Sequence, residues 1–295
     1  MKVVVTGASG FLGSAICKDL LDKGHEVLGI SRNAAEQDAS LSPKMTWSTL
    51  AEADINGHDA VVHLAGEPLF PGRWTAEKKE RIVQSRVEGT RDLVAILSAC
   101  SVPPKVLISA SGVGYYGQRV DDRVDESAKP GRDFLAQICV DWEAAASKAE
   151  ELGVRVVQMR LGVVLGAKGG ALKRMIPIFR WGVGGPIGSG KQPFPWIDCR
   201  DVVDFVAAAL EREDIKGPVN LVAGSPTQKE FAQELGRVLK RPAFLPAPGF
   251  SLKILFGEGA ASLLGGQNVE SSRLEEWALL PRVNDLNQAL SASVS

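Results

Sequence analysis

The sequence predicts an α/β protein with a doubly wound parallel sheet and a smaller C-terminal substrate lobe. In the first half, short β-branched runs alternate with amphipathic helical stretches, the pattern of a parallel sheet covered on both faces. A glycine-rich turn, Gly7-Ala8-Ser9-Gly10-Phe11-Leu12-Gly13, separates the first strand from the first helix. With 295 residues and 45% hydrophobic content, the chain can also bury a sizeable core.

The expected strands are short and apolar, and each expected helix is long enough to form a right-handed crossover between parallel strands. We place strands at Lys2 to Thr6, Glu26 to Ser31, Ala60 to Leu64, Lys105 to Ser109 and Val154 to Leu161. We place helices at Gly10 to Lys23, Thr75 to Ala99 and Phe134 to Leu152.

After Gly166 the sequence becomes rich in glycine and proline. This change divides the chain into a dinucleotide-binding domain at residues 1–165 and a smaller lobe at residues 166–295, interleaved with the sheet. In the second part we expect helices at Asp201 to Leu210 and Gln228 to Leu239, and a strand at Val219 to Val222.

Composition excludes several classes of partner. Lys and Arg number 34 and Asp and Glu 35, so no charge excess favours nucleic acid or an anionic membrane. No signal peptide precedes the first strand, and we expect a cytoplasmic protein. The four cysteines and three histidines are scattered, and a metal site needs them clustered. We therefore expect a small-molecule partner and no metal.

The glycine turn predicts a dinucleotide site of the Rossmann type. It follows the apolar run Val3-Val4-Val5 and opens a helix, whose backbone N–H groups and dipole can receive a pyrophosphate. Gly7 would form the turn, Gly10 would admit the phosphates and Gly13 would let the helix lie close to the sheet. The intervening Ser9, Phe11 and Leu12 belong to the same predicted cofactor site. A tight turn without a ligand is the alternative.

The end of the second strand indicates which dinucleotide binds. NAD-binding folds usually place an acidic residue there for the ribose 2′-hydroxyl, whereas this chain has Ser31-Arg32. A guanidinium binds phosphate oxygens bidentately, and the serine hydroxyl can add a hydrogen bond. This pair favours NADP(H), although Arg32 as a solvated surface residue is the alternative.

Further motifs resemble the extended short-chain dehydrogenase/reductase superfamily, and within it the subgroup of NAD-dependent epimerase/dehydratase-like proteins labelled "epimerase family protein". The resemblance covers nearly the whole chain. It is carried by His63-Leu64-Ala65-Gly66-Glu67-Pro68, Arg73-Trp74-Thr75, Ser85-Arg86-Val87-Glu88-Gly89-Thr90, Ser109-Ala110-Ser111-Gly112-Val113-Gly114-Tyr115-Tyr116-Gly117, Gly184-Gly185-Pro186-Ile187-Gly188-Ser189-Gly190 and Trp196-Ile197-Asp198.

The resemblance implies further cofactor contacts. Leu64, Ala65 and Gly66 would pass under the adenine and ribose, and Arg86 would approach the cofactor from the long helix. Leu165 would lie on the nicotinamide side. For Arg86 the alternative is a side chain whose stem packs over the sheet.

Catalytic members of the superfamily use a Tyr four residues before a Lys, whose ammonium lowers the pKa of the phenol. In this chain those positions hold Leu135 and Cys139, which cannot move a proton in this way. Ser111 and Tyr116 are the candidate catalytic replacements, although counting back from the Tyr-Gly pair reaches Gly112. Tyr115, four residues before Arg119, is a further candidate.

Two functions remain open. The first is an NADP(H)-dependent oxidoreductase or sugar-nucleotide epimerase-like protein without the usual Tyr-Lys pair. The second is a non-catalytic NADP(H) sensor or scaffold, a class that fits the cell-division label of some relatives. A nucleotide-linked substrate would use cations and aromatics of the second half, whose candidates are Arg174, Arg180, Trp181, Lys191 and Trp196. Relatives often form homodimers, and the stripe through Trp142 could serve as a dimer seam or as core.

Overall fold

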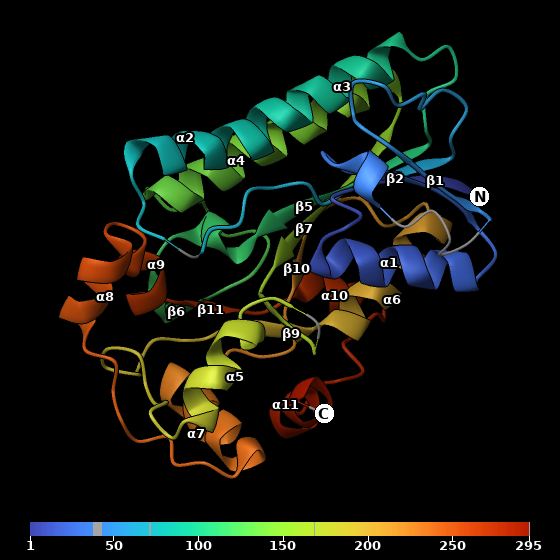
Figure 1. The fold of residues 1–295 in the computed structure, drawn as a ribbon. Helices are drawn as coiled ribbons and strands as arrows, with labels where there is room; N and C mark the ends of the chain where they lie inside the picture. The colour runs from blue at the N-terminus through green and yellow to red at the C-terminus, as the bar shows by residue number, and fades with distance from the viewer. Residues whose placement is uncertain (38–42, 71, 168, 295) are drawn as a thin grey trace.

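The computed structural model describes residues 1–37, 43–70, 72–167 and 169–294. Its centre is a parallel sheet in the strand order β10-β7-β5-β4-β1-β2-β3 (Figure 1). These strands are β1 (Lys2–Thr6), β2 (Glu26–Ile30), β3 (Met45–Ser48), β4 (Ala60–His63), β5 (Val106–Gly112), β7 (Arg155–Leu161) and β10 (Gly217–Leu221). The doubly wound fold predicted from the sequence is confirmed.

Helices cover both faces of the sheet, because each central strand is apolar on both sides. On one face, Val3 and Val5 pack with Ile16 and Phe205. On the other face, Val4 packs with residues of the opposite helices. Figure 1 shows the two layers, formed by α1 (Phe11–Asp22) with α6 (Cys199–Glu211), and by α3 (Gly89–Ala99) with α4 (Phe134–Ser147).

The predicted long helix before β5 is a single run of three segments. It comprises α2 (Ala76–Val83), a π-helical turn at Gln84–Glu88 and α3. A π-helical turn of this kind often marks a functional site, and this one carries Arg86. Thr75 caps the helix, since its side chain accepts a hydrogen bond from the Lys78 backbone N–H.

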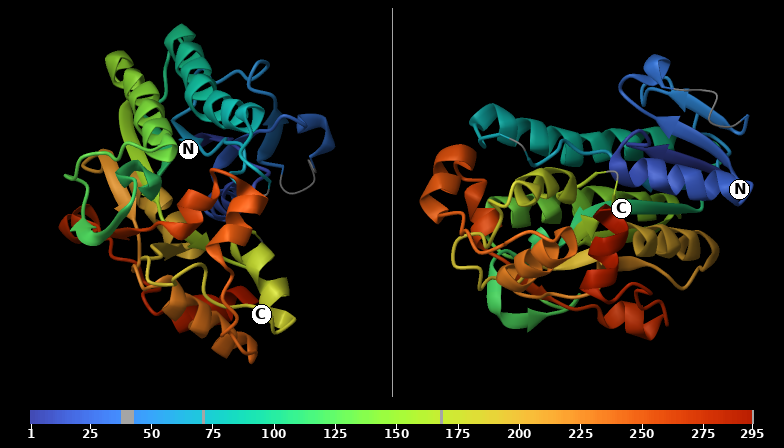
Figure 2. Two further views of the ribbon diagram at one scale, coloured as in Figure 1. Left: turned by 90° about the vertical axis from the view of Figure 1, so that its left-hand side faces the viewer. Right: turned by 60° about the horizontal axis from the view of Figure 1, so that its bottom comes forward.

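The second half of the chain returns to the sheet before it forms a separate layer. Strand β10 forms one edge of the sheet, and helix α6 packs on one of its faces. The remaining elements lie below and to the left of the sheet in Figure 1, and Figure 2 shows them from two further sides. They are β6 (Arg119–Val124), β8 (Val163–Leu165), α5 (Leu172–Arg180), β9 (Trp196–Asp198), α7 (Gln228–Leu239), α8 (Gly249–Phe256), α9 (Ala260–Leu264), β11 (Gln267–Val269) and α11 (Leu286–Val294). Helix α10 (Ser272–Glu276) instead packs against the sheet, where Leu274 joins the core.

Some expected boundaries differ from the structure. Strand β3, with the sequence Met-Thr-Trp-Ser, was not expected from the sequence. Strand β5 extends three residues beyond the expected Ser109, which brings Ser111 and Gly112 into the sheet. The division of the chain at residue 165 stays a prediction.

Ala278 offers a test of local stability, because it has a φ of 54° after helix α10. The backbone there closes the helix through Leu279 N to Leu274 O at 2.8 Å and Ala278 N to Glu275 O at 3.0 Å, a helix end that favours glycine. We expect Ala278→Gly to raise the free energy of unfolding by about 1 kcal/mol, because the left-handed conformation disfavours a Cβ atom. Urea unfolding measures this change.

The matched control is Ala144→Gly, at an exposed position within α4. This substitution should lower stability by about 1 kcal/mol, since glycine has a poor helix propensity. A loss of stability in both variants would contradict the strain assigned to Ala278.

Candidate active site

At Gly7, Gly10 and Gly13, the turn between β1 and α1 and the start of the helix leave little room for a Cβ atom. Gly7 has a φ of 66°, and a Cβ atom there would lie 3.0 Å from the carbonyl carbon of Leu64. A Cβ atom on Gly13 would lie 2.2 Å from the Gly7 carbonyl oxygen, and one on Gly10 would lie 3.0 Å from the same oxygen. Because α1 begins directly after Gly10, its free N–H groups face this turn. The turn is thus shaped for the close approach of a pyrophosphate.

The residues next to these glycines have different surroundings. The Oγ atoms of Ser9 and Ser31 lie 3.4 Å apart, across the turn. The Phe11 ring lies below the glycines that follow β8, 2.8 Å from the position of a Cβ atom on Gly166. Leu12 packs against the core beneath α1.

Arg32 follows β2 with an exposed side chain. Its charge contributes to the lowered pKa of Glu67, whose largest cause is a hydrogen bond from Lys78. The Ser31 hydroxyl accepts a hydrogen bond from the Asn33 backbone N–H at 3.3 Å, which orients the hydroxyl at the strand end.

A buried hydrogen-bond chain positions the end of β4. The Thr6 Oγ1 and His63 Nδ1 atoms are 2.7 Å apart, and His63 Nε2 lies 2.9 Å from Thr90 Oγ1. Burial lowers the pKa of His63 to about 4, so this ring is neutral at pH 7. The Thr6 hydroxyl oxygen also accepts hydrogen bonds from the backbone N–H groups of Leu64 and Ala65. The predicted Leu-Ala-Gly segment is thereby held against the glycine turn.

Arg86 lies between the β4 loop and helix α4. Its Nη1 donates to the Glu67 carbonyl oxygen at 2.9 Å, and its guanidinium carbon is 5.2 Å from the centre of the Trp142 ring. A Cβ atom on Gly66 would lie 3.2 Å from that carbon. Burial lowers the pKa of Arg86. Its guanidinium therefore faces the β4 loop, and its stem does not merely cover the sheet.

The two positions of the usual catalytic pair are part of a packing face. Leu135 contacts Gly114, with its Cβ 3.5 Å from the position of a glycine Cβ. Cys139 is 7% exposed, and burial raises the pKa of its thiol to about 12, a rise that the charge of Arg86 opposes. Trp142 is 6% exposed. The stripe through Trp142 is thus core of this chain and not a dimer seam.

Ser111 and Tyr116 belong to one buried network. The Ser111 hydroxyl donates to Glu143 Oε1 at 2.7 Å, and the Tyr116 hydroxyl donates to Asn220 Oδ1 at 2.7 Å. Arg160 joins them, because it bonds Glu143 through Nε and Nη2, each at 2.8 Å, and donates from Nη1 to the Tyr116 hydroxyl at 2.9 Å. Burial raises the pKa of Tyr116 to about 12. Both hydroxyl protons are therefore held by buried acceptors.

The arginine next to Tyr115 is Arg160, and not Arg119, which the sequence spacing suggested. The guanidinium carbon of Arg160 lies 3.5 Å from the centre of the Tyr115 ring. Arg119 lies on β6 and pairs with Asp122 at 3.6 Å. The spacing of Tyr115 and Arg119 is thus not the contact that the fold uses.

Residues predicted from the second half differ in burial. Leu165 has no exposed surface, backbone included, and packs with Leu172 and Phe179. Trp196 is also buried, at 2% exposed. Trp181 is 85% exposed. Arg174, Arg180 and Lys191 are exposed as well.

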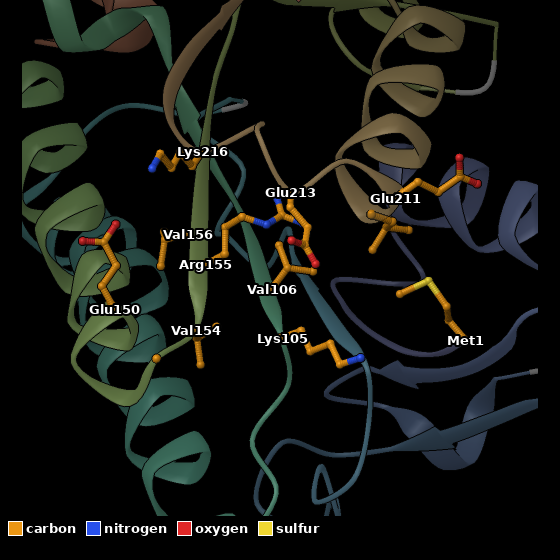
Figure 3. Close-up of a pocket in the computed structure, with 12 residues that line it drawn as sticks. Met1, Lys105, Val106, Glu150, Val154, Arg155, Val156, Glu211, Glu213 and Lys216 are labelled. Atoms are coloured by element: carbon orange, nitrogen blue, oxygen red, sulfur yellow. The ribbon is translucent and has the colours of Figure 1, made fainter.

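Cavities lie near both the amino ends and the carboxyl ends of the central strands. One cavity, of about 740 Å³, lies at the amino ends of β5 and β7, where Arg155 lies beside Glu213 (Figure 3). Ligands of parallel α/β sheets bind at the carboxyl ends of the strands, so this cavity is on the wrong edge. A smaller cavity of about 280 Å³ lies next to Gly114 and Leu135.

The residues that the structure describes, 1–37, 43–70, 72–167 and 169–294, lack two features. In that part of the chain, no group of three or more His, Cys, Asp and Glu side chains is arranged to hold a metal ion. No helix there combines the length and apolar character needed to cross a membrane.

Sequence reasoning missed Glu67, Trp142 and Glu143 as members of the site. Trp142 and Glu143 follow Cys139 by three and four residues, so the helical period could have placed them on the same face. Glu67 follows directly after Gly66, but its contact with Arg86 requires the tertiary structure.

Residues 3–224 match the family described as the NAD dependent epimerase/dehydratase family. The chain belongs to this family. Residues 247–292 match a domain of unknown function, DUF1731. Membership of the epimerase/dehydratase family confirms the resemblance drawn from the sequence motifs.

Relatives in the epimerase/dehydratase family match nearly the full length. The "Epimerase family protein SDR39U1 homolog, chloroplastic" of Arabidopsis thaliana is 40% identical over 301 residues, 99% of this chain and 86% of the relative. The crystal structure of human epimerase family protein SDR39U1 (isoform 2) with NADPH has a TM-score of 0.90 and 36% identity, and the match covers 100% of this chain and 99% of that one. The cytoplasmic location stays a prediction, since the Arabidopsis name gives a chloroplast location.

A more distant structure shares the fold alone. UDP-glucuronic acid 4-epimerase from Bacillus cereus, in complex with UDP-glucuronic acid and NAD, has a TM-score of 0.81 and 21% identity, with 100% of this chain and 98% of that chain covered. The ligands in its structure are therefore ligands of that enzyme and are not assigned to this chain.

Proposed function

We propose that this chain is an NADP(H)-dependent oxidoreductase that acts on a small molecule without the usual Tyr-Lys pair. The observation that carries the cofactor assignment is Arg32, a cation placed at the end of β2 where NAD-binding folds have an acid. The glycine turn, which has no Cβ atom at Gly7, Gly10 and Gly13, fits the pyrophosphate, and the human relative was crystallised with NADPH. NADP(H) would supply the hydride chemistry itself.

Arg86 supports the use of the cofactor at the far end of the same cleft. In catalytic relatives a lysine on the helix after β5 supplies a positive charge, and here Cys139 has taken its position. The Arg86 guanidinium is the cation that the structure brings to this part of α4, above Trp142. The buried indole nitrogen of Trp142 has no hydrogen-bond partner within the described protein. We propose that both groups face the nicotinamide ribose and hold its hydroxyls.

The prediction for Arg86 separates it from Arg32. We expect Arg86→Met to weaken NADPH and NADH binding to a similar extent, by about 10–100-fold, since a hydrogen bond from a charged group contributes about 1.5–3 kcal/mol. Titration calorimetry with both cofactors measures this. Arg91→Met, on the exposed side of α3, is the matched control and should leave both affinities unchanged.

A loss of NADPH affinity alone would place Arg86 at the 2′-phosphate and contradict its proposed position. Arg86 also holds the Glu67 carbonyl, so its loss could disturb the fold. The affinities are therefore compared only if the melting temperature of Arg86→Met stays near that of the parent protein.

The assignment of Ser111 and Tyr116 as proton-transfer residues stays a proposal. Their hydroxyls already donate to Glu143 and Asn220, which favours positioning of the strand end over proton transfer. Turnover of NADPH with a panel of carbonyl compounds by Ser111→Ala and Tyr116→Phe tests the proposal. Loss of turnover with unchanged NADPH affinity and melting temperature would support catalysis.

The second candidate function is a non-catalytic NADP(H) sensor or scaffold. It is favoured by Leu135 and Cys139, which pack where catalytic relatives move a proton. Tight NADPH binding without hydride transfer to any carbonyl or sugar-nucleotide substrate would support the sensor. A measured turnover that depends on bound NADPH would exclude it.

A further inference from the structure

The small cavity beside Leu135 joins the two halves of the chain. It lies between the beginning of α4 and helix α9, and it has a volume of about 280 Å³. Leu135 and Gly114 form part of its wall. Leu135 occupies the position of the tyrosine that catalytic relatives direct at the nicotinamide. The other lining residues are Trp74, Gln118, Asp133, Phe134, Glu258, Ala261, Ser262, Gly265 and Gln267.

Aromatic and aliphatic side chains form one side of this cavity. The rings of Trp74 and Phe134 meet edge to face, with centres 5.6 Å apart. The Trp74 indole N–H donates to the Leu69 carbonyl at 3.0 Å, so its polar atom is already satisfied. These rings and Leu135 offer an apolar contact surface to a ligand.

The opposite side is polar but contains no cation. Gln118, Ser262 and Gln267 are neutral, and the Gln267 amide donates to the Gly117 carbonyl at 2.7 Å. Asp133 accepts the Ala136 backbone N–H at the start of α4. Glu258 pairs with Lys79 at 2.6 Å.

The two carboxylates that line the cavity are therefore already engaged. Lys79 is bonded to Glu258 and also lies 4.5 Å from the centre of the Phe134 ring. A nucleoside diphosphate is held by free guanidinium or ammonium groups, and none of the cavity's described lining residues carries one. Two carboxylates at its rim would repel a diphosphate.

The size of the cavity also argues against a nucleoside diphosphate as its ligand. Ligand pockets that bury drug-sized molecules span about 300–1,000 Å³, and this cavity lies just below that range. It has room for one ring with a few substituents, whereas a nucleotide sugar contains a base, two sugars and two phosphates.

We propose that this cavity binds a small, uncharged, one-ring carbonyl compound or the corresponding alcohol, and not a nucleotide-linked sugar. The inference rests on the proposed function, because it assigns the substrate class of that site. In the reductive direction the carbonyl carbon accepts the hydride of NADPH. The carbonyl oxygen accepts a proton from solvent at the cavity mouth, and the products are the alcohol and NADP⁺.

The test uses the exposed rim residue Ala261, on α9. Benzyl alcohol and cyclohexanol serve as probes with the full-length protein and saturating NADPH, and saturation-transfer NMR measures their binding. We expect Ala261→Trp to weaken probe binding at least tenfold, because the indole fills the cavity, while NADPH affinity stays unchanged. Ala144→Trp, on the exposed face of α4 outside the cavity, is the matched control and should bind as the parent does.

UDP-glucuronic acid is the competing ligand. Binding of UDP-glucuronic acid that Ala261→Trp abolishes would overturn the proposal, as would probe binding that is absent or insensitive to Ala261→Trp. The proposed function fails separately if NADPH does not bind. Probe binding to the cofactor-free protein that is lost in Ala261→Trp would then still support the ligand class of the cavity.

Discussion

Arg160→Met should lower the free energy of unfolding by about 3–5 kcal/mol, the cost of leaving one member of a buried ion pair without its partner. The Arg160 side chain is 3% exposed and that of Glu143 is 10% exposed. Removal of the guanidinium leaves the Glu143 carboxylate with Ser111 as its remaining hydrogen-bond donor, and it leaves the Tyr116 hydroxyl without the N–H that it accepts. Chemical unfolding, followed by tryptophan fluorescence, measures the loss.

Two controls separate burial from charge. Arg91→Met removes an exposed pair with Glu88, whose side chains are 60% and 51% exposed, and should cost less than about 1 kcal/mol. The double substitution Glu143→Leu with Arg160→Met removes both buried charges, and we expect it to recover part of the stability. Equal losses in Arg160→Met and Arg91→Met would contradict the structural importance of the network.

Arg32→Ala should weaken NADPH binding by about 10–100-fold, because charged hydrogen bonds to the 2′-phosphate contribute about 1.5–3 kcal/mol and 1.4 kcal/mol corresponds to a factor of ten. The exposed Arg32 contributes little to packing, so the fold should tolerate the change. NADH lacks the 2′-phosphate, and its affinity should change less than about twofold. Calorimetric titration of both cofactors gives the ratio.

Arg237→Ala is the matched control for net charge. Arg237 is an exposed residue of α7, paired with Glu234 far along the chain from the glycine turn. It should leave the preference for NADPH unchanged. If Arg32→Ala also keeps that preference, Arg32 is a surface residue and the assignment of NADP(H) loses its main support.

The glycine turn and the cofactor strand ends were predictable from the sequence, because their geometry depends on neighbouring residues. Gly7, Gly10 and Gly13 are spaced for a strand-to-helix turn, and the structure shows how little room a Cβ atom would have there. Arg32 follows the second strand, as the apolar pattern indicated. The loss of the Tyr-Lys pair at Leu135 and Cys139 was also readable by counting along one helix.

Only the tertiary structure decided how the candidate catalytic hydroxyls are used. Ser111 looked free in the sequence, but the fold brings it to Glu143, 32 residues later. Tyr116 donates to Asn220, 104 residues later, on the edge strand β10. Such partners cannot be inferred from spacing, because burying a charge or a hydroxyl requires a partner that the packing of distant elements provides.

The cavity beside Leu135 likewise separates what the sequence determined from what the tertiary structure decided. The sequence determined a dinucleotide fold with a phosphate turn, an arginine at the end of its second strand and no standard proton donor. The cavity itself arises where Leu135 of α4 meets Ala261 of α9, which belong to different matched domains. Local sterics specify a turn within a few residues, whereas the shape and charge of a pocket depend on which side chains the completed fold places opposite one another.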